Sequence, residues 1–162
     1  MSIQIGQPLP DVAIRLVEDG IHEQRTGELF AHGKTVLFGV PGAFTPTCSE
    51  KHLPGYVAAF DAFRERGIAV HCLAVNDAYV MQAWAANRKV PQGLKMLADG
   101  NADFTRALGL ELDGSAYGMG LRARRFALYA ADGVVKLLHV EAPGELRVST
   151  ATAMLAAIDA LR

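Results

Sequence analysis

The sequence is poor in cysteine, with only Cys48 and Cys72 among its 162 residues. Two cysteines are too few for a disulfide scaffold, and in a reducing compartment such residues are more often buried or catalytic than paired. The chain also lacks any apolar run of the roughly 18 residues that cross a bilayer. The sequence therefore argues against a disulfide-rich secreted domain and predicts no membrane insertion.

An excess of charge of either sign is missing as well. The 16 basic and 17 acidic residues give a formal net charge of -1 at pH 7 and are spread along the whole chain. Without a broad positive field, we expect no binding to nucleic acid or to anionic lipid. The N-terminal stretch MSIQIGQPLPDVAIRL lacks the basic start, apolar block and cleavage site of a secretory signal, so we expect a cytoplasmic protein.

Internal repeats and Gly/Ser linkers are absent too, so nothing in the sequence marks a domain boundary. A chain of 162 residues is long enough for one domain with a full hydrophobic core and too short for two domains of ordinary size. We therefore expect one domain over residues 1–162.

The hydrophobic pattern predicts alternating strands and helices. Short apolar runs that end in glycine or are rich in β-branched residues predict buried strands over 34–40 and 67–75. Between them, helical spacing over 46–66 predicts a helix with a kink at Pro54. The later elements are a helix over 78–89 after Asn76 and Asp77, a strand over 94–99, a hairpin of 125–130 and 134–140 around Asp132-Gly133, and a helix over 150–161. This order favours a thioredoxin-like α/β fold, with a mixed central sheet flanked by helices on both faces.

The stretch GVPGAFTPTCSEKHLPGY, residues 39–56, places a cysteine where a strand ends and a helix begins. If the helix begins at Thr45 or Pro46, Cys48 lies in its first turn, where unpaired amides and the helix dipole favour a negative sulfur. In that setting a thiol pKa falls well below about 8.5. Position alone thus makes Cys48 a candidate nucleophile. Thr45 is either an N-cap or a hydroxyl directed at the same pocket, and the two roles can coexist.

The run VPGAFTPTCS, with EKHLPGY directly after it, resembles the active-site signature of the peroxiredoxins, and of the type II (peroxiredoxin V) subfamily in particular. Three later segments, CLAVNDAYVMQAW, KMLADGNADFTRALGL and RRFALYAADGVVKLLHVE, are similar to the same subfamily in the same order. The resemblance therefore covers nearly the whole chain.

The resemblance implies a thiol peroxidase that reduces hydrogen peroxide and alkyl hydroperoxides without a metal or an organic cofactor. Cys48 is then the peroxidatic cysteine, and Thr45 is the hydroxyl that contacts thiolate and peroxide. Pro41 shields the sulfur, although the residues alone are also explained by a tight turn in a loop. Arg125 completes the site, because a guanidinium holds the thiol ionised and donates hydrogen bonds to peroxide. Arg124 is the alternative if the register slips by one.

The resolving step departs from the pattern of the subfamily. Many members carry a second reactive cysteine near the C-terminal loop, whereas the matching stretch EAPGELRVSTATAM has none and carries Ser149 near that place. The sulfenic acid is then reduced by an outside thiol. The resemblance implies glutathione with glutaredoxin as the first choice and thioredoxin as the second. Cys72, inside an apolar strand, is expected to be a buried thiol, with resolution by Cys72 after local unfolding as the alternative.

Assembly is predicted from the resemblance and from three aromatic residues. Peroxiredoxins of this type suggest a homodimer, and Phe44, Tyr79 and Trp84 have the potential to form an apolar contact surface.

Two histidines give further expectations. His52, one helical turn after Cys48, is expected to face solvent or to cap the helix, with an electrostatic effect on the Cys48 thiol as the alternative. His71 lies beside Cys72, but adjacent strand residues point to opposite faces, which excludes a zinc pair.

Two other functions stay open: a thioredoxin-fold binding or chaperone-like protein with a structural cysteine, and a cysteine hydrolase that uses Cys48 with His52 or His139.

Overall fold

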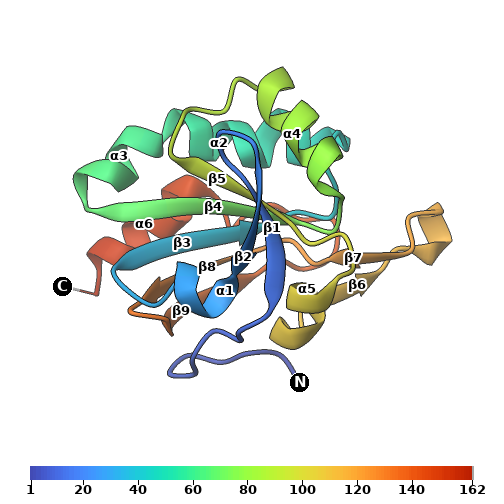
Figure 1. The fold of residues 1–162 in the computed structure, drawn as a ribbon. Coiled ribbons are helices and arrows are strands. Elements are labelled where there is room, and N and C mark those ends of the chain that lie inside the picture. The colour runs from blue at the N-terminus through green and yellow to red at the C-terminus, as the bar shows by residue number, and fades with distance from the viewer. Residues whose placement is uncertain (162) are drawn as a thin grey trace.

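The computed structural model describes residues 1–161, and a mixed β-sheet runs through its centre (Figure 1). Within these residues the strands are β1 Ala13–Val17, β2 Ile21–Arg25, β3 Lys34–Gly39, β4 Ile68–Ala74, β5 Leu94–Ala98, β6 Glu111–Asp113, β7 Leu121–Ala123, β8 Phe126–Ala131 and β9 Val134–Val140. The central sheet has the order β2-β1-β5-β4-β3-β8-β9, and β6 pairs with β7 separately. β3 is parallel to β4 and β4 to β5, whereas the outer pairs are antiparallel.

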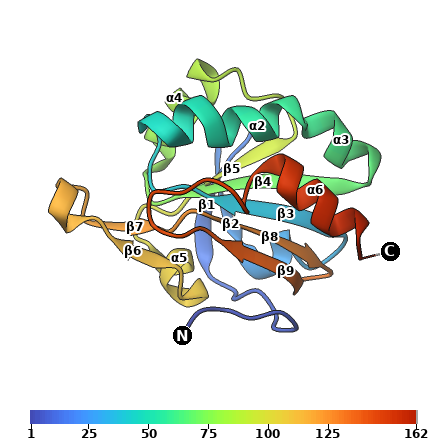
Figure 2. The same ribbon diagram turned by 180° about the vertical axis from the view of Figure 1, so that it is seen from behind.

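Helices cover both faces of this sheet (Figures 1 and 2). They are α1 Thr26–Leu29, the π-helical turn η1 Cys48–His52, α2 Leu53–Ala58, α3 Phe60–Glu65, α4 Ala78–Asn87, α5 Asp103–Leu108, the 3₁₀ turn η2 Ser115–Tyr117 and α6 Ala151–Asp159. Residues of α2, α3, α4 and α6 share one apolar cluster, and residues of α5 belong to the other. The predicted thioredoxin-like arrangement is confirmed.

Side chains of the central strands alternate between the two clusters. On β3, Val36 and Phe38 lie in the cluster under α2 and α3, whereas Leu37 lies in the opposite one. On β4, Cys72 joins the first cluster, while the ring of His71 lies 5.0 Å from that of Phe30 on the other side. The two neighbours therefore face apart, as strand geometry predicts, and form no metal pair.

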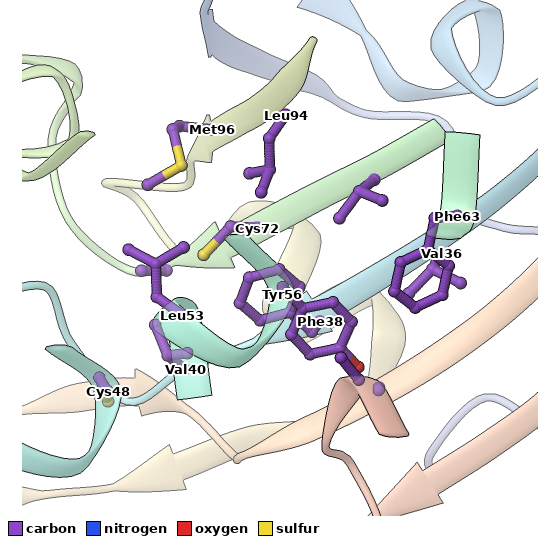
Figure 3. Packing of buried hydrophobic residues seen from close by; sticks show 14 of the residues in the cluster. Val36, Phe38, Val40, Cys48, Leu53, Tyr56, Phe63, Cys72, Leu94 and Met96 are labelled. Atoms are coloured by element: carbon purple, nitrogen blue, oxygen red, sulfur yellow. The ribbon is translucent and has the colours of Figure 1, made fainter. Parts of the chain in front are cut away.

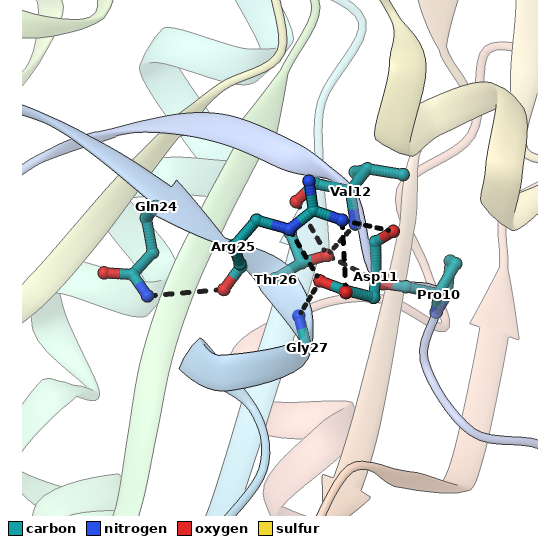
Figure 4. Close-up of polar contacts among 7 residues, drawn as sticks. All are labelled: Pro10, Asp11, Val12, Gln24, Arg25, Thr26 and Gly27. Carbon is teal, nitrogen blue, oxygen red and sulfur yellow. Dashed lines mark hydrogen bonds and ion pairs between the residues drawn. The ribbon is translucent and has the colours of Figure 1, made fainter.

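The N-terminal hairpin of β1 and β2, with α1 after it, was not predicted. Polar contacts tie it to the preceding segment (Figure 4). The Asp11 carboxylate accepts from Arg25 Nη2 at 3.1 Å and from the Gly27 N–H at 3.0 Å. The Thr26 hydroxyl donates to Pro10 O at 2.7 Å. These partners are 14 to 16 residues apart, so no local sequence pattern predicts these hydrogen bonds.

Predicted caps and turns are found where the sequence placed them. The Asp77 side chain accepts from Val80 N at the start of α4, and the β8–β9 hairpin turns at Asp132 and Gly133 with φ of 50° and 82°.

The prediction of one helix over 46–66 is corrected by the structure. The helix begins at Pro46, but η1 interrupts it and a second break falls at Ala59, between α2 and α3. The kink at Pro54 stays a prediction, and the structure places this proline at the second position of α2, directly after the π-helical turn.

Candidate active site

The end of β3 brings two distant parts of the chain together. Gly39 is the partner of Phe126 at the start of β8. A Cβ at Gly39 would lie 2.1 Å from the Phe126 ring, so only glycine permits this approach. The pairing sets Arg125, 77 residues after Cys48, beside the loop that follows β3.

That loop has a strained and well-anchored backbone. Phe44 adopts φ of 64°, a left-handed conformation that is uncommon for a bulky residue and recurs at functional sites. The N–H of Ala43 donates to Asn76 Oδ1 at 2.9 Å. Ser49 N donates to Thr45 O at 2.9 Å, which is the first turn of the helix, and Cys48 lies within this turn as predicted.

The Cys48 sulfur has a guanidinium as its polar partner. Arg125 Nη2 lies 3.1 Å from Cys48 Sγ, and the cysteine has no exposed surface. Arg124 is exposed instead, and its Nε lies 3.3 Å from Glu111 O. The structure thus brings Arg125 to Cys48, and not the alternative residue.

His52 contradicts the expectation of a solvent-facing or capping side chain. It is 1% exposed, accepts from Arg125 Nη1 at 3.0 Å and lies 3.0 Å from Ser149 O through Nε2. Burial lowers the pKa of His52 to about 4. The hydrogen bond to Ser149 opposes this shift, and the positive charge of Arg125 lowers the pKa further. Residues four apart share one face of a helix, so His52 lies on the side of Cys48, and the Arg125 guanidinium contacts both side chains.

Thr45 and Pro41 border the same region. The Thr45 hydroxyl donates to Gly42 O at 2.7 Å, and it makes neither an N-cap hydrogen bond with the helix nor a hydrogen bond with Cys48. Pro41 is half-buried and lines a pocket of about 210 Å³ together with Thr47 and Arg125.

Cys72 is the buried thiol that the sequence predicted. It has no exposed surface, and burial raises its pKa well above the ordinary value. In the view of Figure 3, Leu53 and Val40 lie between it and Cys48. Both cysteines are free.

The side chain of Trp84 also lies in the core. It has no exposed surface, and its Nε1 donates to Ser49 Oγ at 2.9 Å. The expectation that Trp84 contributes to a contact surface is therefore wrong, whereas Phe44 and Tyr79 are 51% and 76% exposed.

A cysteine hydrolase does not fit this geometry. Both ring nitrogens of His52 are engaged by Arg125 and Ser149, and His139 Nδ1 lies 2.7 Å from Val148 O. His52 is therefore not free to take a proton from Cys48, and His139, which is held through Nδ1 at Val148 O, makes no hydrogen bond with Cys48. Within residues 1–161, no group of three or more His, Cys, Asp or Glu side chains could hold a metal. None of the helices in the described part of the chain is long and apolar enough to cross a membrane.

A buried thiol in the first turn of a helix, on a thioredoxin-like sheet and bonded to a guanidinium, defines a thiol-based redox protein. The Redoxin family model matches residues 4–155. Peroxiredoxin-2E, a chloroplastic protein of Arabidopsis thaliana, is 44% identical over 97% of this chain and 70% of its own length. Peroxiredoxin-2B of the same plant is 41% identical, over 96% of this chain and 98% of its own.

The solved structures agree with these relatives. Reduced Prx3 of Vibrio vulnificus in complex with hydrogen peroxide superposes with a TM-score of 0.91 at 47% identity, over 97% of this chain and 96% of that one. The chain therefore belongs to the Redoxin family and, within it, to the peroxiredoxins, which are thiol peroxidases. This confirms the resemblance found in the sequence and replaces the alternative of a non-enzymatic binding or chaperone-like protein.

Proposed function

We propose that this chain reduces hydrogen peroxide and alkyl hydroperoxides through Cys48 and that an outside thiol resolves the product. The observation that carries the proposal is the 3.1 Å hydrogen bond from Arg125 Nη2 to Cys48 Sγ. A hydrogen bond from a guanidinium is charge-assisted, and it is stronger to a thiolate than to a thiol. Cys48 is therefore the thiol better suited to act as a nucleophile.

In the proposed reaction, the Cys48 thiolate attacks one peroxide oxygen and its electron pair forms an S–O bond while the O–O bond breaks. The leaving oxygen takes a proton and departs as water or an alcohol, and a sulfenic acid remains on Cys48. Charge moves from sulfur to the leaving oxygen, so a donor held in advance, as Arg125 is, stabilises the transition state more than the ground state. The peroxide bound to the Vibrio vulnificus Prx3 supports hydrogen peroxide as a substrate here.

Thr45 and Pro41 have supporting roles in this proposal. Because the Thr45 hydroxyl gives its proton to Gly42 O, its oxygen lone pairs are available to accept a hydrogen bond from a peroxide O–H. Pro41, on the wall of the 210 Å³ pocket, limits the access of bulk water to the sulfur.

The proposed reductant is glutathione with glutaredoxin, and thioredoxin is the second choice. The stretch that carries a second cysteine in many relatives has Ser149 here, and its hydroxyl donates to Glu141 Oε2. Cys72 is buried with a raised pKa, so it is poorly suited to attack a sulfenic acid in the folded protein. An outside thiol that enters the pocket lined by Thr47 and Arg125, the neighbours of Cys48, needs neither Ser149 nor Cys72 to act as the resolving residue. Because such a cycle depends on a pool of reduced thiols, we also propose a cytoplasmic location.

Intact-mass spectrometry of the Cys72→Ser variant tests the reductant. After one equivalent of peroxide and then glutathione, we expect a mixed disulfide of one glutathionyl group on Cys48, which glutaredoxin clears faster than thioredoxin does. Suppose instead that no mixed disulfide forms and that turnover is restored only by thioredoxin and only in protein that contains Cys72. Resolution by Cys72 would then replace this proposal.

A further inference from the structure

Four residues close a ring of hydrogen bonds that includes the guanidinium of Arg125. Arg125 Nη1 lies 3.0 Å from His52 Nδ1, and His52 Nε2 lies 3.0 Å from the carbonyl oxygen of Ser149. The N–H and hydroxyl of Ser149 donate to Glu141 Oε2 at 2.8 and 2.6 Å. The Glu141 N–H then donates to Arg125 O at 3.0 Å, which closes the ring.

The ring assigns the protons on His52. A guanidinium can only donate, so Nδ1 is the acceptor and Nε2 carries the proton that goes to Ser149 O. Burial and the neighbouring guanidinium keep His52 neutral at physiological pH, because they lower its pKa to about 4. With Nη1 held by His52, the plane of the Arg125 guanidinium is fixed and Nη2 is directed at Cys48 Sγ.

Glu141 anchors the far side of the ring. It is 7% exposed, and its Oε2 accepts from the N–H groups of Arg147, Val148 and Ser149 and from the Ser149 hydroxyl. Burial alone would raise the pKa of Glu141, but these hydrogen bonds outweigh it and lower the pKa below the ordinary value. An ionised carboxylate thus holds the turn that presents the Ser149 carbonyl to His52.

We propose that Glu141 is a positioning residue for peroxide reduction at Cys48. Its carboxylate fixes the Ser149 carbonyl, and through that carbonyl and His52 it keeps Arg125 within hydrogen-bonding reach of the sulfur. The proposal rests on the function proposed above for Arg125 and extends it to Glu141, which lines the same pocket as Arg125 but makes no hydrogen bond with the sulfur.

A residue that only anchors the loop 141–149 would stabilise the fold without changing the reaction of Cys48. A positioning residue changes the peroxide reaction in protein that is still folded. The two roles therefore separate when the rate of peroxide reduction is measured beside a reaction of the same sulfur that needs no donor for a leaving oxygen. Alkylation by iodoacetamide is such a reaction.

Glu141→Gln is the first variant, and Glu23→Gln is its control. Glu23 lies on β2, does not line the pocket that Arg125 lines, and forms an ion pair with Arg15 at 3.7 Å on the surface. At a pH where the Cys48 thiol of each protein is fully ionised, we expect Glu141→Gln to slow sulfenate formation roughly tenfold and alkylation less than about twofold. The control should match the wild type in both reactions.

His52 provides a test of the pathway. In His52→Gln, the amide can still accept from Arg125 and donate to Ser149 O, so this variant should retain most of the peroxide rate that His52→Leu loses. Adding Glu141→Gln to His52→Leu should lower the rate little further, since both act through one chain of contacts. Fully additive losses, or a wild-type peroxide rate in Glu141→Gln, would overturn the proposal.

Two further variants keep the outcome decisive. If Glu141→Gln does not fold, Ser149→Ala removes one of the four donors to Oε2 and should slow the peroxide reaction about two- to threefold; no change would count against Glu141. Arg125→Ala separates the two levels of inference. If Arg125→Ala reacts normally with peroxide, the proposed role of Arg125 fails, whereas a slow Arg125→Ala beside a normal Glu141→Gln rejects the positioning role alone.

Discussion

Cys48 and Cys72 have contrasting surroundings, which predict contrasting effects of substitution. Cys48 accepts a hydrogen bond from a guanidinium, whereas Cys72 lies among apolar side chains on β4 with a raised pKa. We expect Cys48→Ser to abolish peroxide reduction and Cys72→Ser to keep most of it, measured by stopped-flow kinetics with hydrogen peroxide. Equal loss in two folded variants would refute a mechanism with one peroxidatic cysteine.

Arg125, which contacts the Cys48 sulfur, and Thr45, three residues before Cys48, should affect the rate and not the fold. Arg125→Ala and Thr45→Val are each expected to slow sulfenate formation by roughly tenfold to a thousandfold, the scale for loss of a preorganised donor or acceptor. Thr45→Ser should be milder, because it keeps the hydroxyl. Arg124→Ala is the control, since that side chain is exposed and directed to Glu111 O. A normal second-order rate in Arg125→Ala or Thr45→Val would remove that residue from the site.

Part of the site could be read from the sequence, and part of it could not. Thr45 and Cys48 stand in one short stretch whose order of strand end, proline and helix start has a local physical meaning. Arg125 was reached only by resemblance, because nothing local distinguishes it from Arg124. The contacts of His52 with Arg125 and Ser149 join residues 73 and 97 positions apart, so no spacing rule reveals them.

At the scale of elements, the fold was predicted best where pattern and capping agree. The Asp77 cap of α4 and the Asp132-Gly133 turn of the β8–β9 hairpin are examples. The helix after Cys48 was predicted as one piece, because its apolar spacing does not encode the π-helical turn. The hairpin of β1 and β2 was missed because its strands are short and no residue of β2 is fully buried.

The strand β4 and the turn η1 each bury a histidine, and this predicts sensitivity to acid. Burial lowers the pKa of His71 to about 3 and that of His52 to about 4, from an ordinary value of 6.5. Between these values the unfolded chain binds more protons than the folded one, so the free energy of unfolding falls as pH falls from about 6.5. By pH 5 each histidine should lower it by about 2 kcal/mol.

Urea unfolding at pH 7 and pH 5 measures this loss. His71→Asn is the comparison, because Asn can keep a polar contact near Thr35 Oγ1, which lies 2.7 Å from His71 Nδ1, but does not titrate. The variant should lose less stability between the two pH values than the wild type does. The same loss in both proteins would show that His71 is not the source.

At the scale of the whole molecule, two exposed aromatic side chains support the proposed homodimer. Phe44 is 51% exposed on the loop before Cys48, and Tyr79 is 76% exposed on α4. We expect the mass of a dimer by light scattering at micromolar concentration. Phe44→Asn removes the aromatic ring but tolerates the φ of 64°, so it should weaken the dimer without unfolding the chain. A monomeric wild type would contradict the prediction.

The most direct test of a single peroxidatic cysteine resolved from outside is the product of one turnover without reductant. The reduced protein receives one equivalent of hydrogen peroxide, and intact mass with peptide mapping identifies the product. We predict a gain of one oxygen on Cys48 and an unmodified Cys72, with excess peroxide adding a second oxygen to Cys48 and a parallel loss of activity that glutathione prevents. A quantitative disulfide between Cys48 and Cys72 in the folded monomer would contradict this mechanism and make Cys72 the resolving residue.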